Sequence, residues 1–276
     1  MDSRIITIYV LVDDLLKSLR HREDPQCRMS DAEVLTTALV AALFFGGKIE
    51  TSRWFLREQN YIPCMLSKSR LNRRLHRCRH LLVILFQILS EMWKQLNEDA
   101  IYVVDSFLVP ACDNIRIQRC RLYRDDVYRG YQASKRRYVY GLKVHLMVTA
   151  SGAPVEFFFT PASFSDVSAL DLFDFDLPAG STVYGDKAYN WYLFEDLLAE
   201  LGIRLLPIRR KNSRRPLPPW ERYLQARHRK MIETAVSNIE RLLPKHIHAV
   251  TSAGFELKLV LFILAASFNA LHPLLV

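Results

Sequence analysis

The stretch TVYGDKAYNWY, residues 182–192, decides how the fold is interpreted. A short apolar segment ends at Gly185, and Asp186 then meets Lys187 where a helix is expected to begin. In open α/β sheets, ligands bind outside the carboxyl ends of the strands, which is where Asp186 is expected to lie. An aspartate in this position also suits a simple helix cap. The stretch therefore predicts a site only if further carboxylates join it.

Two more carboxylates occupy comparable positions. Asp105 ends the apolar run IYVVD, which predicts a buried central strand. Glu233 lies at the edge of the apolar face of a late helix, HRKMIETAVSNIERLLP. We interpret Asp105, Asp186 and Glu233 as a catalytic, metal-binding triad. Each has a structural alternative, because Asp105 would cap a turn, Asp186 would cap a helix and Glu233 would pair with Arg229.

Three carboxylates in such positions suit phosphodiester chemistry. Their hard oxygen atoms are the ligands that Mg²⁺ and Mn²⁺ prefer. Two such ions, about 3.5–4 Å apart, stabilise both the attacking and the leaving oxygen of an in-line displacement. We therefore expect two Mg²⁺ or Mn²⁺ ions at the triad, with water or a DNA 3′-hydroxyl as the nucleophile.

The composition predicts a well-packed, basic protein with an anionic partner. The chain has 276 residues, half of them hydrophobic, and a net charge of +9. This excess favours nucleic acid as the partner, with a merely basic soluble protein as the alternative. The five cysteines show no C-x-x-C spacing, which indicates reduced thiols in the cytoplasm. We find no signal peptide, and we interpret the uncharged run from Leu259 as a buried helix.

Residues 1–98 follow helical spacing and form the first predicted domain. A capping box at Ser30 and Glu33 begins one of the helices. A later segment, SKSRLNRRLHR, interleaves arginines with Leu71 and Leu75. This pattern is typical of a helix that lays cations along DNA, and a solvated basic face is the alternative. The residues predicted to contact DNA are Lys68, Arg70, Arg73, Arg74 and Arg77.

Residues 99–276 change to strand periodicity and form the second predicted domain. YVYGLKVHLMVT alternates, and the turn at Gly152 and the run PVEFFFTP complete a predicted hairpin in which His145 is structural. The final helix, FELKLVLFILAASFNAL, is expected to cover the sheet. The densest charge lies in residues 204–230, where prolines predict an extended loop and the cations are expected to grip a phosphate backbone. The residues predicted to contact DNA here are Arg209, Arg210, Lys211, Arg214, Arg215 and Arg229.

These segments resemble the DDE transposases of bacterial insertion sequences, and most closely the insertion-sequence 982 family. The resemblance covers nearly the whole chain and rests on SKSRLNRRLHR, VVDSFLVP, YGLKVHLMVT, YGDKAYN, RKMIETAVSNIE and VTSAGFELK, in this order. It implies an α/β fold with a ribonuclease H-like mixed-sheet catalytic core behind a helical DNA-binding region. It also implies that Asp105, Asp186 and Glu233 are the DDE residues.

The resemblance further implies cleavage and strand transfer at terminal inverted repeats, in the bacterial cytoplasm at the nucleoid. Because two DNA ends are joined together, we expect a homodimer on double-stranded DNA. Related transposases carry a tyrosine–arginine–glutamate–lysine signature, of which Arg229 and Glu233 are present, whereas Ala226 and Glu240 replace the tyrosine and lysine. Two alternatives stay open: a ribonuclease H-like endonuclease without strand transfer, and a non-catalytic DNA-binding protein of transposase descent.

Overall fold

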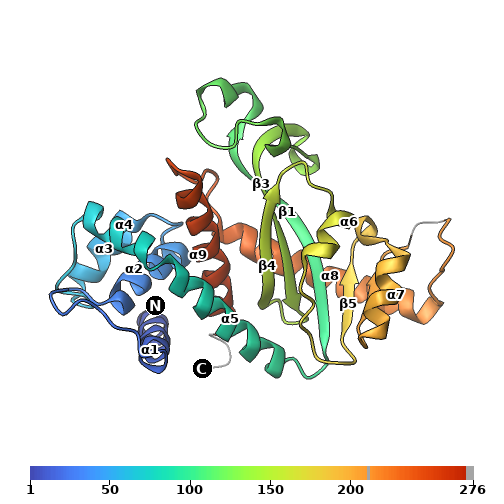
Figure 1. Cartoon of the computed structure of the whole chain (residues 1–276), viewed down its shortest axis with the longest axis horizontal. Coiled ribbons are helices and arrows are strands. Elements are labelled where there is room, and N and C mark those ends of the chain that lie inside the picture. The colour runs from blue at the N-terminus through green and yellow to red at the C-terminus, as the bar shows by residue number, and fades with distance from the viewer. Residues whose placement is uncertain (210–211, 272–276) are drawn as a thin grey trace. The chain divides into compact units, whose positions relative to one another are not determined.

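The fold is described from a computed structural model, shown in Figure 1. It describes residues 1–209 and 212–271. Within these ranges, the side chains of Ser134 and of residues 229–233 and 235–236 lie outside the description.

The chain forms two compact units that divide it differently from the two predicted domains. The first unit joins Met1–Leu89 to Ile239–Val276, and the second is Ser90–Asn238. The C-terminal segment joins the first unit because the apolar helix α9 (Ser252–Leu271) packs against α2 (Asp31–Phe44). The predicted second domain, residues 99–276, included this helix because it follows the strands in the chain.

The first unit is helical, and α2 is its central element. Its helices besides α2 and α9 are α1 (Asp2–Ser18), α3 (Ile49–Glu58), α4 (Lys68–Arg77) and the first part of α5 (Arg79–Leu96). Helix α2 is buried on nearly every side, and the predicted capping box of Ser30 and Glu33 begins it. Helix α9 is long and apolar enough to cross a membrane by length and composition, but most of it is buried within the structure.

The second unit is built on a mixed sheet of six strands. They are β1 (Ile101–Asp113), β2 (Arg129–Gln132), β3 (Arg137–Thr149), β4 (Pro154–Pro161), β5 (Thr182–Gly185) and β6 (Arg204–Pro207). The order is β2-β3-β1-β5-β6, and β4 also pairs with β3. Strands β2, β3, β4 and β1 pair antiparallel, whereas β1, β5 and β6 pair parallel. The predicted hairpin is confirmed as β3 and β4.

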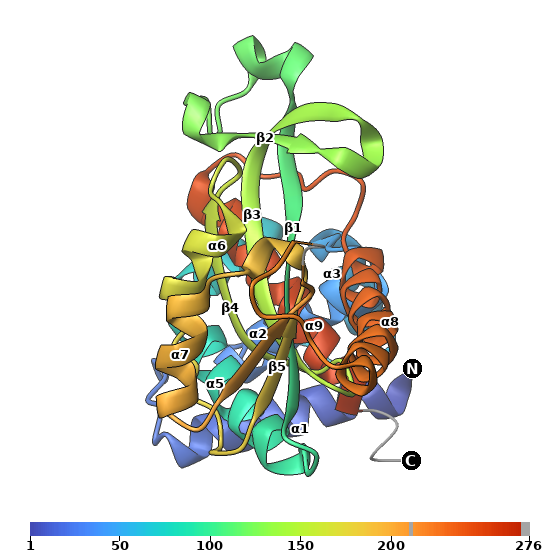
Figure 2. The ribbon, with the colours of Figure 1, turned by 90° about the vertical axis from the view of Figure 1, so that its right-hand side faces the viewer.

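Helices flank the parallel part of the sheet. The second unit contains α6 (Asp166–Ala169), α7 (Tyr192–Glu200), most of α8 (Pro219–Leu242) and the short 3₁₀ helix η5 (Lys187–Tyr189). Figure 2 shows α7 and α8 on either side of β5. Helix α7 forms the crossover from β5 to β6, as parallel strands require.

Strand β1 is longer than the sequence suggests. It was expected to end at Asp105, but it continues to Asp113, and Asp105 pairs with Leu146 in its interior. The expectation was wrong because SFLVPACD, with its serine and proline, lacks a strand pattern and is held by pairing with β3. The register shifts near Pro110, and an added Cβ at Gly141 on β3 would overlap the backbone there. Beyond this point, residues 114–138, which include β2 and the start of β3, extend past the rest of the sheet (Figure 2), and we call them the arm.

Candidate functional site

Asp105 and Asp186 lie at the same level on neighbouring parallel strands. The register between β1 and β5 ends with the pair Val104 and Gly185. Asp105 is the next residue of β1, and Asp186 is the first residue after β5. Because parallel strands run in the same direction, residues one step beyond a paired position emerge side by side. The sheet therefore brings together two carboxylates that are far apart in the sequence.

The two aspartates differ in their local contacts. Asp186 is exposed and precedes η5, but its side chain makes no capping hydrogen bond to that helix. The helix-cap alternative therefore does not describe its carboxylate. Asp105 is half-buried, and its Oδ1 accepts a hydrogen bond of 2.8 Å from the backbone N–H of Ser106.

A carboxylate that binds Ser106, the residue after Asp105, was missed by the sequence interpretation. Asp166 begins α6, and its Oδ1 accepts hydrogen bonds from Ser106 Oγ at 2.6 Å and from Lys143 Nζ at 3.2 Å. Lys143 also donates to the carbonyl of Phe164 at 2.6 Å. Asp166 is thus anchored to β1 and β3 at once. Its only sequence signal is a Ser-Asp pair ahead of a short helix, which suits an ordinary helix start equally well.

Tyr189 ends η5, the short helix that follows Asp186. Its side chain is buried, and its hydroxyl lies near Ser106 but has no partner in hydrogen-bonding geometry among the described residues. Burial raises the pKa of Tyr189 well above its usual value, and the nearby carboxylates of Asp166, Asp105 and Asp186 raise it further. The phenol therefore keeps its proton at physiological pH.

His145 is structural, as predicted. It is fully buried in β3, hydrogen-bonded to Thr160 at 2.9 Å and stacked on Phe158. Burial lowers its pKa to about 4, so it is neutral near pH 7.

The third member of the predicted triad is Glu233. Its backbone is part of α8, but its side chain lies outside the described residues, as do the side chains of Arg210, Lys211 and Arg229. The triad as a whole therefore stays a prediction. Asp105 and Asp186 supply carboxylate oxygens at adjoining strand positions, which is the donor type that Mg²⁺ and Mn²⁺ prefer.

A tighter acidic group lies in the helical unit. In the described part of the chain, only His21, Glu23 and Asp31 bring three potential ligand atoms within 4.8 Å of one another. Arg74 already neutralises this group, because its guanidinium donates to Asp31 and to the carbonyl of Met29 and lies 3.8 Å from Glu23. Arg74, which was predicted to contact DNA, instead ties α4 to the start of α2.

The other predicted cations of α4 face solvent. Leu71 and Leu75 point into the unit and are buried, as their spacing predicts. The exposed cations of the same helix are Lys68, Arg70, Arg73 and Arg77. Arg70, Arg73 and Arg77 share the side of α4 that lies opposite its buried leucines, and all four side chains remain accessible to a partner.

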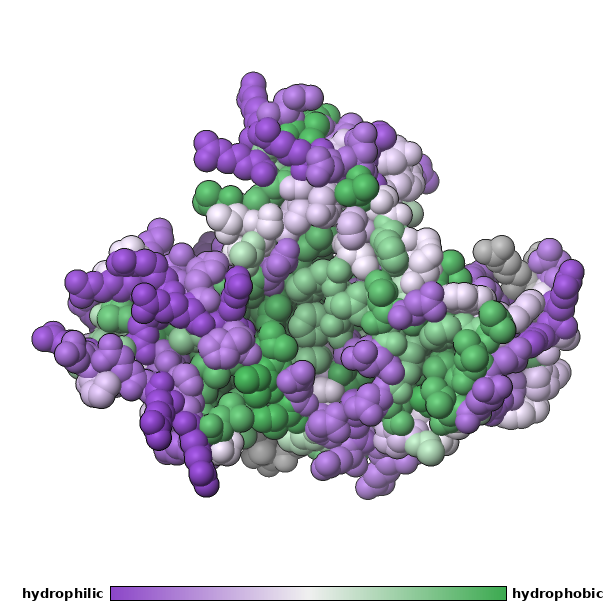
Figure 3. All heavy atoms as spheres, viewed as in Figure 1, coloured by the Kyte–Doolittle hydropathy of each residue, from purple (hydrophilic) through white to green (hydrophobic). Residues whose placement is uncertain are grey.

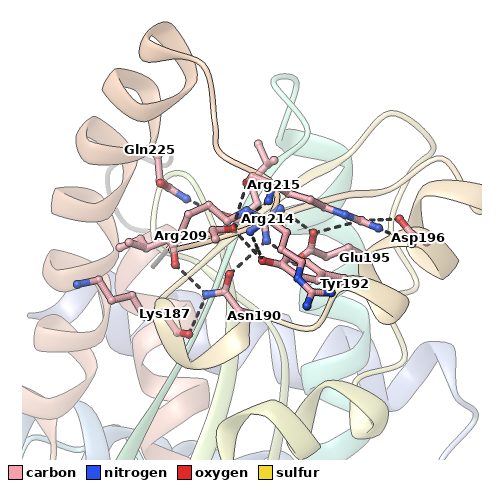
Figure 4. Close-up of polar contacts among 12 residues, drawn as sticks. Lys187, Asn190, Tyr192, Glu195, Asp196, Arg209, Arg214, Arg215 and Gln225 are labelled. Carbon is pink, nitrogen blue, oxygen red and sulfur yellow. Dashed lines mark hydrogen bonds and ion pairs between the residues drawn. The ribbon is translucent and has the colours of Figure 1, made fainter. Parts of the chain in front are cut away.

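A second group of predicted DNA contacts is held within the protein (Figure 4). Arg209 donates to both carboxylate oxygens of Glu195, at 2.6 and 2.7 Å, and the two side chains are only 10% and 6% exposed. Arg209 also donates to Asn190, whose amide binds the carbonyls of Lys187 and Ile208. Arg209 therefore fixes the turn that follows Asp186 and is not available to a DNA phosphate.

Arg215 and Tyr192 fasten the loop that follows (Figure 4). Arg215 binds both carboxylate oxygens of Asp196, at 2.6 and 2.9 Å, and stacks over the ring of Tyr192. The hydroxyl of Tyr192 lies 2.8 Å from Ser213 Oγ and accepts a hydrogen bond from the backbone N–H of Arg214. Only the guanidinium of Arg214 in this set has no assigned partner among the described residues.

Comparison with known proteins adds to this geometry. Residues 95–248, more than half of the chain, match the model of a family described as transposase DDE domain. No curated protein matches the chain. Among solved structures, the chain is similar to a cryo-EM structure of a piggyBac transposase synaptic complex with hairpin DNA, with 11% identity and a TM-score of 0.45. That alignment covers 96% of this chain and 72% of the other. This distant similarity carries no argument about substrate or mechanism.

Proposed function

Because the chain belongs to the DDE transposase domain family, we propose that it binds the terminal inverted repeats of its element and catalyses metal-dependent DNA cleavage and strand transfer. The observation that carries this proposal is the β1–β5 register, which sets Asp105 beside Asp186. The mixed sheet, with antiparallel strands on one side of β1 and parallel strands on the other, supports a ribonuclease H-like core. The similarity of motifs supports the insertion-sequence 982 family and a bacterial source.

In this proposal, Asp105, Asp186 and Glu233 hold two Mg²⁺ or Mn²⁺ ions. When bound, these ions stabilise the charge on the attacking and leaving oxygens of the scissile phosphate. Asp166 acts as a positioning residue, since its carboxylate ties Ser106, the neighbour of Asp105, to Lys143.

The exposed face of α4 supports DNA as the partner. Lys68, Arg70, Arg73 and Arg77 present four cations on one helix whose leucines are buried, as expected for a helix that contacts phosphates. Two ends of the element must be processed together, so we propose a homodimer on double-stranded DNA in the cytoplasm.

The test is metal-dependent nicking of DNA that carries the element's ends, comparing wild type with Asp186→Asn. We expect Mg²⁺ or Mn²⁺ to support nicking by wild type, and Asp186→Asn to abolish it while DNA affinity stays within about twofold, because phosphate-contacting cations rather than Asp186 supply affinity. Asp171→Asn is the matched control, because Asp171 is an exposed aspartate in the same unit and the variant should nick like wild type.

Each alternative function has its own outcome. Nicking without joining of a pre-cut 3′-hydroxyl end to a target duplex indicates an endonuclease. Tight binding by wild type without nicking indicates a non-catalytic DNA-binding protein. Equal nicking by Asp186→Asn and wild type would show that Asp186 is not a ligand.

A further inference from the structure

The arm concentrates positive charge on a small projection. Residues 114–138 contain eight arginines and lysines but only two aspartates. In the sequence these cations form two separate basic stretches, one on each side of Asp125 and Asp126. The structure brings the stretches together, because β3 pairs with both β1 and β2 at the base of the arm. The surface of the arm is mostly hydrophilic in Figure 3, where it is the uppermost part.

Most of this charge has no carboxylate partner among the described residues. In the described part of the chain, Arg137 is the only cation of the arm with an ion pair, to Asp113 at 2.9 Å. The exposed cations are Arg116, Arg119, Arg121, Arg124, Arg129, Lys135 and Arg136. Like charges gathered in this way repel one another and destabilise the compact state. Their concentration indicates that the arm serves an external anion.

The arm also presents an exposed aromatic face. Tyr131 on β2 and Tyr138 on β3 are cross-strand partners, with ring centroids 5.1 Å apart. The guanidinium of Arg129 lies 4.2 Å from the centre of the Tyr138 ring. The two tyrosines are 52% and 47% exposed, which leaves much of both rings open to a ligand.

The back of this aromatic face is fixed to the rest of the unit. Gly130 lies between Arg129 and Tyr131 and faces the opposite way, as alternate strand residues do. It is buried, and an added Cβ would lie 2.8 Å from the Cβ of Ala162. The backbone of Val127 also accepts hydrogen bonds from the N–H and hydroxyl of Ser163. These contacts behind β2 therefore hold the tyrosine pair in a fixed position.

We propose that the arm is a second DNA-binding surface, separate from the α4 face, and that it binds DNA with unpaired bases. The inference rests on the proposed transposase function, which supplies DNA as the substrate. The cations of the arm bind phosphates, and the Tyr131–Tyr138 pair with Arg129 stacks against an unstacked base. Exposed aromatic rings within a basic surface are the feature that binds single-stranded nucleic acid without sequence preference.

The experiment measures binding of the full-length chain by fluorescence anisotropy, over a range of salt concentrations. The probes are a blunt duplex and the same duplex with a short unpaired 3′ flank. The charge variant combines Arg116→Gln, Arg119→Gln and Arg121→Gln, and it leaves out Arg124 because that guanidinium binds the Cys120 carbonyl. The ring variant combines Tyr131→Ala with Tyr138→Ala, and its matched control replaces both tyrosines with Phe.

The two variants should lose affinity for different probes. We expect the charge variant to bind both probes roughly tenfold or more weakly, with a salt slope reduced by about 0.9 for each phosphate that it no longer neutralises. The ring variant should bind the flanked probe roughly tenfold more weakly, change little on the blunt duplex, and be rescued by the Phe control, because base stacking needs the rings and not the hydroxyls. All the replaced side chains are exposed, so thermal melting should match wild type.

Unchanged affinity of both variants on both probes would overturn the inference. The inference would also be overturned if the full-length chain bound duplex RNA of the same sequence more tightly than either DNA probe and the charge variant lost this binding. If the arm variants bind and nick like a nicking-competent wild type, the arm inference fails and the transposase proposal stands. If wild type neither binds nor nicks DNA, the proposed function itself fails.

Discussion

Two arginine-rich segments, α4 and the loop after β6, look alike in the sequence but use their charge differently. In α4, Arg70 and Arg73 face solvent, and Arg74 alone turns inward to Asp31. In the loop after β6, the guanidinium groups of Arg209 and Arg215 both bind carboxylates of α7. The first segment offers its cations to a partner, whereas the second uses them to fasten the chain next to Asp186.

The difference teaches that charge density alone does not identify a nucleic-acid surface. What decides is whether acidic side chains from distant segments fold against the cations. Helix α7 brings Glu195 and Asp196 to the loop, but in the described part of the chain only the start of α2 and the segment before it meet α4 in this way. By the same criterion the cations of the arm are available to a partner, because few of the described acidic side chains lie against them.

Breaking the buried pair in the loop should produce the largest effect. Replacing Arg209 with Ala leaves the Glu195 carboxylate buried and unpaired, so we expect the free energy of unfolding to fall by about 3–5 kcal/mol. Arg209→Lys should recover little of the lost free energy of unfolding, because a lysine does not reproduce the two-point contact with the carboxylate. Arg215→Ala, at a more exposed pair, should cost less than about 1 kcal/mol. Urea denaturation measures all three, and equal losses would contradict the comparison.

Arg74 should behave like the loop arginines despite its place in α4. Arg74→Ala removes the cation that holds Asp31 and Glu23, and we expect a loss of about 2–3 kcal/mol in unfolding free energy, at the low end because the group is only partly buried. The neighbouring Arg73→Ala is the control and should stay within about 0.5 kcal/mol. If Arg73→Ala proved as destabilising as Arg74→Ala, the inward and outward faces of α4 would be wrongly assigned.

Glu156 is the opposite case to Glu195, because its carboxylate has no ion pair among the described residues. It accepts a 2.6 Å hydrogen bond from the backbone N–H of Asp174, yet burial raises its pKa to about 7. The unfolded state therefore loses this proton at lower pH than the folded state, and the carboxyl destabilises the fold progressively as pH rises from about 4.5 to about 7. Glu156→Gln should stabilise the protein at pH 8 by on the order of 2 kcal/mol and have little effect at pH 4.

The measurement for Glu156 is the difference between variant and wild type at each pH. His145, whose pKa burial lowers to about 4, contributes the opposite slope between about pH 4 and 6.5 in both proteins, so it cancels from the difference. A difference that does not change with pH would show that Glu156 titrates as it does in water.

The smallest effect on stability should come from the exposed face of α4. Replacing Arg70, Arg73 and Arg77 together with Gln should leave the free energy of unfolding within about 0.5 kcal/mol, as for surface substitutions generally. The same variant should bind duplex DNA more weakly and with a shallower salt dependence. Anisotropy against salt tests this, and an unchanged slope would remove α4 from the DNA-binding surface.

Local patterns predicted those parts of the fold that local interactions determine. The capping box at Ser30, the inward positions of Leu71 and Leu75, and the β3–β4 hairpin are all confirmed. Asp186 was correctly placed just past the end of a strand. In each case, residues within a few positions of one another decide the structure.

The missed features depend on pairing between distant segments. The length of β1 is set by its register with β3, which the mixed pattern after Asp105 does not reveal. The inward turn of Arg209 requires Glu195, and the role of Asp166 requires Ser106 and Lys143 from two other strands. A single sequence contains these residues but not their distances.

The ends of the arm have a consequence for how this protein can change over evolutionary time. Asp113 and Val139 are cross-strand partners, so the two ends of the arm meet at one position of the β1–β3 pairing. A segment whose ends already meet can be gained, shortened or exchanged by one insertion or deletion, since a tight turn would join the same two strands. Asp105 lies further back along β1, and the register that sets it next to Asp186 would be kept after such an exchange. The arm can thus diverge without disturbing the register that holds the two aspartates.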